Sequence, residues 1–360
     1  MRLKRLEQWW RRLWIRMLVG AMRRSADPRP NWASRPSRVL FLRHDRAGDM
    51  IVSTGIIRGI ARSHPTITMD VLASPANSAI IETSDYVTNL VVFDKKRLSS
   101  YLPTLLRLRS AHYDAVIDCM VTAPSVTTLL LILASGARHR IGIAGRGNDA
   151  AFNLLVPVAA SSDAHMVDRI ADLAQAFDVV LDTAARHPVL EISDDERARA
   201  EELWGASPGI RRILINVSAG TSDRVWPDDN YIAIMRRLHE QEPAAVLRVI
   251  AAPAESERGA RIARAGGGAF VPTPNIRDAF ALVATADFVL TPDTSIAHAA
   301  SAFHRPSVAL YTRGKAERWG LYGTIGRNIE HSELTLATLS VDRVSEAIDS
   351  VLASSLATRG

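Results

Sequence analysis

The chain has 360 residues with 47% hydrophobic and 23% charged side chains, and its formal net charge is +6. This composition is that of a globular protein and excludes a disordered chain, and the length favours two domains over one. The single cysteine, Cys119, excludes both an intramolecular disulfide and a cysteine-based zinc cluster, which fits a reducing compartment. Cys119 lies in the apolar stretch AVIDCM, and we interpret it as a buried side chain rather than a nucleophile.

The positive charge belongs to the N-terminal segment. Residues 1–24 contain eight Lys and Arg residues against a single Glu, so the rest of the chain has a net charge of about −1. A nearly neutral body without a nucleic-acid-binding motif indicates that nucleic acid is not a partner.

Residues 1–24 have the pattern of a basic amphipathic helix. The apolar positions recur every three or four residues and share one face; they are Leu3, Leu6, Trp10, Leu13, Trp14, Met17 and Ala21. The apolar runs are too short for a membrane span, and arginines interrupt any signal-peptide core. We expect this helix to dock on an anionic membrane surface, the alternative being that it packs on the protein body or on a partner. Residues 25–37, which contain three prolines, are expected to form a linker.

From residue 38 onward, short apolar runs alternate with helical patterns. In the first half, strands are expected at 39–42, 67–73, 90–93, 115–120 and 141–143, and helices at 50–63, 76–83, 97–110, 124–135 and 164–180. Short connections between strands and helices predict a parallel, doubly wound sheet. The acidic, proline-marked stretch from Pro188 to Glu196 is interpreted as a join between two domains.

The second half repeats the alternation. Strands are expected at 212–217, 245–251, 269–272, 287–291 and 307–311, and helices at 228–241, 255–265, 276–285, 295–303 and 341–356. We therefore predict two Rossmann-like α/β domains that face a central crevice. The first covers residues 38–187 and the second residues 188–325, and residues 326–360 form a C-terminal segment with a closing helix.

The stretch RVLFLRHDRAGDMIVSTGIIRG, residues 38–59, predicts a buried strand, a turn and the start of a helix. In open α/β sheets, ligands bind at the carboxyl ends of strands, where such turns lie. Asp49 follows Gly48 in this turn, so its carboxylate is placed where chemistry takes place. The alternative for Asp49 is a structural one, capping of the helix.

Two further turns follow strands of the second half. In SAGTSDRVWP, residues 218–227, Gly220, Thr221 and Ser222 offer backbone and hydroxyl donors to a phosphate, and Arg224 offers a positive charge. In TPDTS, residues 291–295, a strand passes into a helix whose first turn suits an anion. Neither turn is a Walker loop or a GxGxxG fingerprint. The structural alternative for Asp293 is a helix cap, and that for His298 is a satisfied helix histidine.

Together these stretches resemble the family 9 glycosyltransferases, whose best-known members are the ADP-heptose:lipopolysaccharide heptosyltransferases. The resemblance rests on VLFLRHDRAGD at 39–49, on residues 218–227, and on ADFVLTPDTSIAHAA with AERWG within residues 286–320. It extends over residues 38 to 355 and implies a GT-B fold of two Rossmann-like domains.

The resemblance also implies roles for individual residues. Asp49 is expected to be the general base on the acceptor hydroxyl. The donor diphosphate and sugar are expected to contact two groups of residues, which are Gly220, Thr221, Ser222 and Arg224 in one and Asp293, Thr294, Ser295 and His298 in the other. Glu255 resembles a carboxylate that holds the nucleoside ribose. Two departures from the family pattern are Ser295, where glycine is usual, and Arg224, where lysine is common.

The implied reaction is a single displacement that inverts the anomeric carbon, with Asp49 accepting the proton of the attacking hydroxyl. The chain contains no Asp-x-Asp motif, so we expect neither a metal nor another cofactor. The expected donor is ADP-heptose, and the expected acceptor is a lipid-linked saccharide of the lipopolysaccharide core. The enzyme would lie in the bacterial cytoplasm, on the inner face of the cytoplasmic membrane. Two alternatives stay open: a GT-B glycosyltransferase with another nucleotide sugar, or a nucleotide-sugar-binding protein without turnover.

Overall fold

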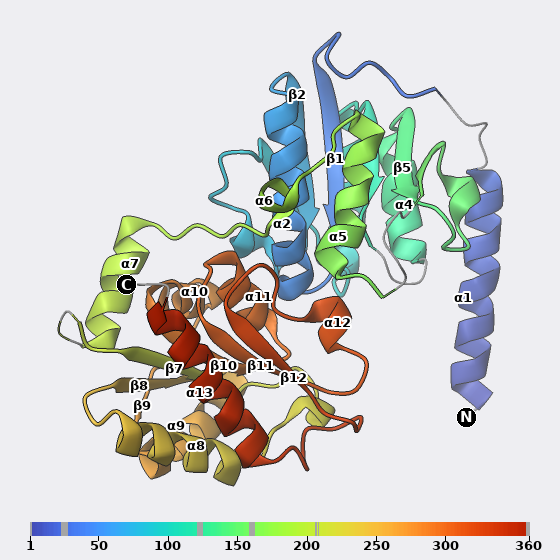
Figure 1. Cartoon of the computed structure of the whole chain (residues 1–360). Coiled ribbons are helices and arrows are strands. Elements are labelled where there is room, and N and C mark those ends of the chain that lie inside the picture. The colour runs from blue at the N-terminus through green and yellow to red at the C-terminus, as the bar shows by residue number, and fades with distance from the viewer. Residues whose placement is uncertain are drawn as a thin grey trace. The chain divides into compact units, whose positions relative to one another are not determined.

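The computed structural model describes residues 2–22, 28–120, 125–157, 163–205, 207 and 209–357. The chain divides into two compact units, Met1–Arg186 and His187–Gly360. Each unit is built on a six-stranded sheet in which every strand pair is parallel (Figure 1).

The sheet of the first unit has the strand order β3-β2-β1-β4-β5-β6. Its strands are β1 (Ser37–Arg43), β2 (Ile67–Ala73), β3 (Asn89–Val92), β4 (Ala115–Asp118), β5 (His139–Ile143) and β6 (Leu154–Val156). Strands β2 and β3 lie on one side of β1, and β4, β5 and β6 lie on its other side. The topological switch point of this sheet therefore lies between the carboxyl ends of β1 and β4.

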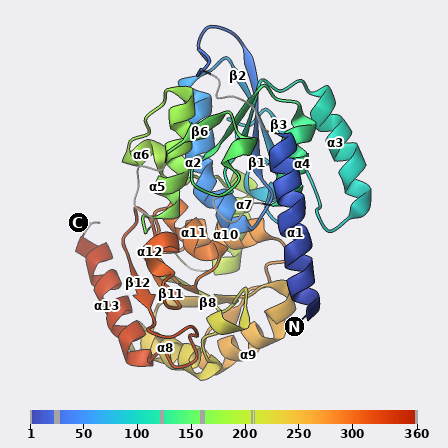
Figure 2. The same cartoon turned by 90° about the vertical axis from the view of Figure 1, so that its right-hand side faces the viewer.

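Helices cover both faces of the first sheet. The helices are α1 (Arg2–Ala21), α2 (Ala47–Ser63), α3 (Tyr101–Ser110), α4 (Val126–Ser135), α5 (Met166–Ala171) and α6 (Thr183–Arg186), with 3-10 turns η1 (Ser78–Ile80), η2 (Leu98–Ser100), η3 (Asp149–Ala151) and η4 (Asp172–Phe177). On one face α4 contacts both α1 and α3, and on the other α2 contacts α5 and α6 (Figure 2).

Helix α1 belongs to the first unit and has two different faces. Ile15, Leu18 and Val19 pack on the core formed by α3, α4 and the sheet, together with the buried Met22. The alternative prediction for this helix, that it packs on the protein body, is therefore confirmed for the face that carries Ile15, Leu18 and Val19. Of the predicted apolar face, Trp10, Trp14, Met17 and Ala21 are exposed and Leu13 is half-buried, whereas the side chains of Leu3 and Leu6 lie outside the described part.

The segment between α1 and β1 contains an anchor that the linker prediction missed. Trp32 is buried, its indole nitrogen donates to the Ala176 carbonyl at 2.9 Å, and its ring lies 4.6 Å from that of Phe177. Residues 28–36 are without helix or strand, as expected of a linker. The buried indole of Trp32 nevertheless fixes residues 28–36 to the first unit.

Two helix predictions for the first unit need correction, and one strand was missed. The helix predicted at 76–83 is only a 3-10 turn, because the Asn77 side chain accepts from the Ser74 amide and donates to the Arg43 carbonyl. The helix predicted at 164–180 divides into α5 and η4 and ends at Asp178, which has a φ of 56°. Strand β6 was not predicted.

The sheet of the second unit has the order β12-β11-β10-β7-β8-β9, which repeats the topology of the first. Its strands are β7 (Arg212–Asn216), β8 (Val246–Ile250), β9 (Ala269–Phe270), β10 (Phe288–Pro292), β11 (Ser307–Tyr311) and β12 (Gly326–Glu330). Its helices are α7 (Asp194–Trp204), α8 (Asp228–Gln241), α9 (Ser256–Gly266), α10 (Ile276–Thr285), α11 (Ser295–Ala302), α12 (Ala316–Trp319) and α13 (Val341–Ala357), with η5 (Ser222–Arg224) and η6 (Pro253–Glu255). The switch point lies between β7 and β10.

The second unit also differs from the sequence expectation. The supposed join at 188–196 includes the start of α7, where Ser193 and Glu196 form a reciprocal capping box. Strand β12, which was not predicted, pairs with β11, and α13 packs on both strands. Strand β12 therefore completes the second sheet, and α13 covers it.

No helix in the described part of the chain is long and apolar enough to cross a membrane.

Candidate functional site

The three stretches singled out in the sequence lie at the switch points of the two sheets. Residues 44–49 follow β1, residues 217–227 follow β7, and residues 293–295 follow β10. These are the positions where open parallel sheets bind ligands, because the loops diverge there and leave backbone groups accessible.

Asp49 is the third residue of α2 and lies beside Arg43. Helix α2 begins at Ala47, and its N-cap residue is Arg46, which makes no side-chain capping bond. Asp49 is therefore not the N-cap residue, although it lies in the first turn, where the helix dipole favours a carboxylate. The carboxylate Oδ1 of Asp49 lies 3.4 Å from a guanidinium nitrogen of Arg43, and its side chain keeps 17% exposure.

Arg43 is a site residue that the sequence analysis missed. It is the last residue of β1 and its side chain is 1% exposed. The guanidinium donates to the backbone carbonyls of Asp49 and Cys119, both at 2.8 Å, and so ties α2 to the end of β4. Burial disfavours its charge, but the nearby carboxylates of Asp45, Asp49 and Asp118 raise the pKa of Arg43 above its ordinary value.

The half-buried Asp45 and the buried His44, beside Arg43, have strongly shifted pKa values. Burial raises the pKa of Asp45 and the carboxylate of Asp49 adds to this, although Arg43, 3.4 Å away, opposes it. Burial, together with the charge of Lys95, lowers the pKa of His44 to about 4. His44 is therefore a neutral imidazole at neutral pH, with Nε2 at 3.2 Å from the Thr128 hydroxyl.

Arg146 is a second cation that the sequence analysis missed. It lies between Gly145 and Gly147, whose φ angles of 81° and 79° need glycine. Asp149 fixes this turn by accepting from the backbone amides of Gly145 and Arg146. The turn brings a guanidinium nitrogen to 3.6 Å from the Asp118 carboxylate. The Gly-Arg-Gly triplet after a strand was the sequence signal that could have found it.

Cys119 is buried, as the sequence predicted, and burial raises the pKa of its thiol to about 12. Such a thiol stays protonated and is not a nucleophile at neutral pH.

In the second unit, the structure brings Arg224, Asp293 and Thr294 together. The guanidinium of Arg224 donates to the Asp293 carbonyl at 2.8 Å and lies 3.1 Å from its carboxylate. Thr294 is the N-cap residue of α11, and its hydroxyl accepts from the Ile296 amide at 3.3 Å. The structural alternative for Asp293, a helix cap, is therefore wrong. The aspartate instead orients an arginine at the start of the helix.

Asn216 completes this group and was missed in the sequence. It is the last residue of β7, and its amide donates to the hydroxyls of Thr291 at 2.9 Å and Thr294 at 3.1 Å. It thereby fixes the turn after β10 to the end of β7. A polar residue directly after the apolar run Ile213–Ile215 was the available signal.

The loop after β7 carries the other predicted donor contacts. Gly220, Thr221 and Ser222 are exposed, and Arg224 is half-buried at the end of this loop. Glu255 lies beside the same loop, because its carboxylate accepts from the Ala219 amide at 3.4 Å. All four predicted residues of the loop and Glu255 therefore lie at the carboxyl edge of the second sheet.

His298 and Ser295 lie on α11. Ser295, which takes the place of the family glycine, is the first residue of the helix and is half-buried. His298 is buried one turn further on, and its ring lies 6.1 Å from that of Trp319 on α12. Within the described residues, no group of three or more His, Cys, Asp or Glu side chains is arranged to hold a metal ion.

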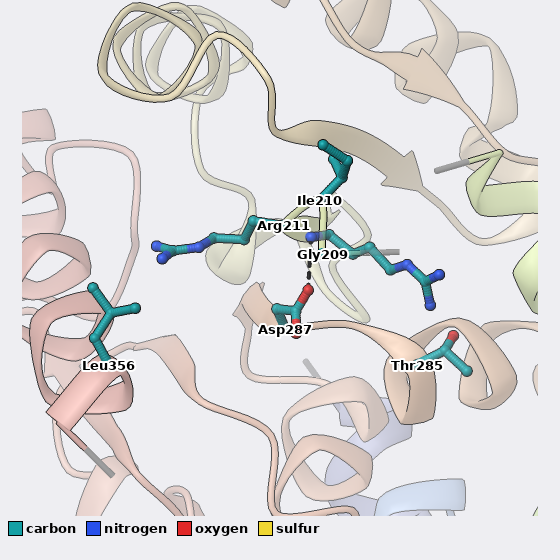
Figure 3. Close-up of a pocket in the computed structure, with 7 residues that line it drawn as sticks. Gly209, Ile210, Arg211, Thr285, Asp287 and Leu356 are labelled. Carbon is teal, nitrogen blue, oxygen red and sulfur yellow. Dashed lines mark hydrogen bonds between the residues drawn. The ribbon is translucent and has the colours of Figure 1, made fainter. Parts of the chain in front are cut away.

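A pocket of about 430 Å³ lies at the opposite, amino-terminal edge of the second sheet, away from these loops (Figure 3). Asp287 lies in it and accepts from the Arg212 amide at 2.9 Å. The guanidinium groups of its two arginines are already paired, Arg211 with Glu242 and Arg212 with Glu201. We assign no function to this pocket.

The model of glycosyltransferase family 9 (heptosyltransferase) matches residues 105–343. This match includes the turns after β7 and β10 but begins after Asp49.

Known proteins resemble the chain over most of its length. The lipopolysaccharide core heptosyltransferase OpsX of Haemophilus influenzae is 22% identical over 304 residues, which are 82% of this chain and 85% of OpsX. A family 9 glycosyltransferase from Veillonella parvula superposes with a TM-score of 0.77 at 15% identity and covers 89% of this chain and 99% of its own. The E. coli heptosyltransferase WaaC, solved with ADP, gives a TM-score of 0.71 at 18% identity and covers 87% and 99%.

Proposed function

We propose a reaction for this chain, which belongs to glycosyltransferase family 9 (heptosyltransferase) and is a glycosyltransferase. It transfers a heptose from ADP-heptose to a saccharide of the lipopolysaccharide core. The heptosyl transfer inverts the anomeric carbon. The observation that carries the assignment of roles is the Asp49–Arg43 pair at one switch point and the Arg224–Asp293–Thr294 group at the other.

The second unit has the chemistry to hold the nucleoside diphosphate. The guanidinium of Arg224 is held in place by Asp293 and keeps 19% exposure of its side chain. It lies at the start of α11, where the first backbone amides and the helix dipole favour a negative charge. These donors, with the hydroxyls of Thr221 and Thr294, stabilise the charge that develops on the leaving diphosphate. Glu255, whose carboxylate accepts from the Ala219 amide of the loop after β7, is placed to accept from ribose hydroxyls as well.

The first unit supplies the base. The acceptor oxygen attacks the anomeric carbon, the bond between that carbon and the diphosphate oxygen breaks, and the acceptor proton passes to the carboxylate of Asp49. Arg43 fixes this carboxylate through both the backbone carbonyl and the side chain of Asp49. A positioned base contributes about 10²–10⁴-fold to the rate. All charge stabilisation in this scheme comes from side chains and amides, and we propose that transfer needs no metal.

The test is transfer of heptose from ADP-heptose to a panel of lipid A core acceptors, with products identified by mass spectrometry. Asp49→Asn should lower kcat by about 10²–10⁴-fold and leave ADP binding unchanged in calorimetry. Asp85→Asn, an exposed carboxylate of the same unit, is the matched control and should retain full activity. Full activity of Asp49→Asn would exclude Asp49 as the base, and activity lost in chelator would exclude the metal-free scheme.

One observation supports a second candidate function. Ser295 places a side chain at the start of α11 where the family pattern has glycine, which narrows the approach of a phosphate to the backbone. A different nucleotide sugar, or binding without turnover, would fit that change. Calorimetry with ADP-heptose against UDP- and GDP-sugars tests the first alternative, since preference for another nucleotide excludes ADP-heptose as the donor. Binding of a donor without product in the transfer assay would indicate the second.

We further propose that the enzyme acts in the cytoplasm at the inner face of the bacterial cytoplasmic membrane, where α1 docks on anionic lipid. Trp14 and Met17 are exposed on α1, next to the exposed Arg16. Aromatic and basic side chains on one helix suit the headgroup region of an anionic bilayer. Loss of vesicle binding on deletion of residues 1–24 is the expected result, and unchanged binding would exclude it.

A further inference from the structure

The exposed apolar side chains of the described residues are unevenly distributed. Seven of the thirteen large ones lie on the layer of helices that covers one face of the first sheet. On α1 these are Trp10, Trp14 and Met17, on η2 and α3 they are Leu98, Leu102 and Leu106, and on α4 it is Leu133. This layer is turned towards the viewer in Figure 2, with α4 between α1 and α3.

The leucines of η2 and α3 form a stripe on the outer side of that layer. Leu102 and Leu106 are four residues apart on α3, which places them on one side of the helix, and Leu98 lies four residues before Leu102 in η2. Leu98, Leu102 and Leu106 are 87%, 65% and 60% exposed. The opposite side of α3 carries Thr104 and Leu108, which are buried. Helix α3 is therefore held to the core by one side and presents leucines with the other.

Five basic side chains flank this stripe. Lys95, Lys96 and Arg97 precede it and Arg107 and Arg109 follow it, and all five are exposed. None of the five forms an ion pair with a carboxylate of the described residues. Helices α3 and α4 contain no Asp or Glu. Cations beside an exposed leucine stripe complement a surface that is anionic outside and apolar beneath.

We propose that the leucine stripe of η2 and α3 is a second membrane-docking element, which binds an anionic phospholipid bilayer together with α1. This inference rests on the proposed location of the enzyme at the membrane and names the surface that maintains it. A single amphipathic element binds membranes weakly and reversibly, whereas two elements on one rigid unit bind additively in free energy. Because α1 and α3 both pack on α4, the two elements hold the first unit in one orientation on the lipid.

The experiment measures co-sedimentation of the full chain with vesicles of phosphatidylcholine, with and without phosphatidylglycerol. The triple variant Leu98→Ser, Leu102→Ser and Leu106→Ser should weaken binding to the anionic vesicles at least about tenfold. Trp14→Ser with Met17→Ser tests α1 in the same assay. Leu334→Ser, an exposed leucine of the second unit, is the matched control and should bind like the unchanged protein.

The outcomes separate this inference from the proposed location. Binding of the leucine variant equal to that of the unchanged protein, with loss in the α1 variant, overturns the second element and leaves docking through α1. Absence of vesicle binding in the unchanged protein overturns both. If the leucine variant instead abolishes a dimer seen in sedimentation velocity, the stripe is an interface between two copies and the lipid proposal is wrong. Circular dichroism and the thermal midpoint of the variant should be unchanged, because the three leucines are exposed.

Discussion

The buried His44 gives a pH dependence of stability whose sign and size follow from the structure. Burial and the charge of Lys95 lower the pKa of its imidazole from 6.5 to about 4. In the unfolded chain His44 takes up a proton below pH 6.5, whereas the folded protein resists this until about pH 4. The contribution of His44 to the free energy of unfolding is therefore fully present above pH 6.5 and is lost as the pH falls. The loss amounts to about 3 kcal/mol, since each pKa unit corresponds to about 1.4 kcal/mol.

Asp45 acts in the opposite direction over the same range. Because burial raises the pKa of Asp45, its carboxyl group stays protonated to a higher pH in the folded protein than in the unfolded chain. Its contribution is present at low pH and is lost as the pH rises through the raised pKa. The two neighbours therefore compensate each other in the unchanged protein, and each single variant should reveal the other.

The assay is urea unfolding followed by circular dichroism at several pH values between 4 and 6.5. The free energy of unfolding of the unchanged protein minus that of His44→Gln should increase by about 3 kcal/mol across this range. For Asp45→Asn, the corresponding difference should change with the opposite sign. A difference that is independent of pH for His44→Gln would refute the reasoning, because it would mean that the imidazole has the same pKa in both states.

Three further substitutions test other parts of the structure. Arg224→Lys should weaken ADP binding about tenfold in calorimetry, because an ammonium cannot hold an aspartate and a phosphate together as the planar guanidinium does; equal affinity would contradict this role. Ser295→Gly should strengthen ADP binding severalfold, since it opens the backbone at the start of α11, and weaker binding would contradict the expectation. Trp32→Ala should cost the first unit about 3–5 kcal/mol through the cavity it leaves, which an unchanged thermal midpoint would disprove.

The central strands were predictable because their sequences carry a strong local signal. The run Val39–Leu42 is fully buried in β1, and strands β7, β10 and β11 are buried in the same way. A strand that is covered on both faces has a nearly continuous apolar run, so it can be predicted without knowing which strands lie beside it. The edge strand β12, with the sequence GRNIE, lacks this signal because its side chains remain partly exposed.

Helices that depend on tertiary bonds were harder to predict. The stretch around Ser78 has a helical pattern, but the Asn77 side chain binds backbone groups of the preceding residues Arg43 and Ser74, and the 3-10 turn ends after three residues. The start of α7 was predictable in principle from its capping box. It was missed because acidic residues and a preceding proline also mark loops.

Site residues in the turns after β7 and β10 were found, whereas Arg43 and Asn216 at the ends of strands and Arg146 in the turn after β5 were missed. Arg224, Asp293 and Thr294 lie next to each other only because β7 and β10 are neighbours, and their turns carry recognisable glycine, threonine and aspartate patterns. Asn216 has no such pattern around it. Its role follows from two hydroxyls that are 75 and 78 residues away in the chain, a pairing that a single sequence does not contain.

The two switch points repeat one arrangement with one decisive difference. In each unit an arginine holds an aspartate by its backbone carbonyl and by its carboxylate, Arg43 with Asp49 and Arg224 with Asp293. The side chain of Arg43 is 1% exposed, so it acts only on protein groups and orients the carboxylate of Asp49. The side chain of Arg224 is 19% exposed, so it can bind its aspartate and an anionic ligand together. The arginine–aspartate pair thus presents a base in the first unit and a cation in the second. Glycosyl transfer from a nucleoside diphosphate requires both, a base for the acceptor proton and a cation for the leaving diphosphate.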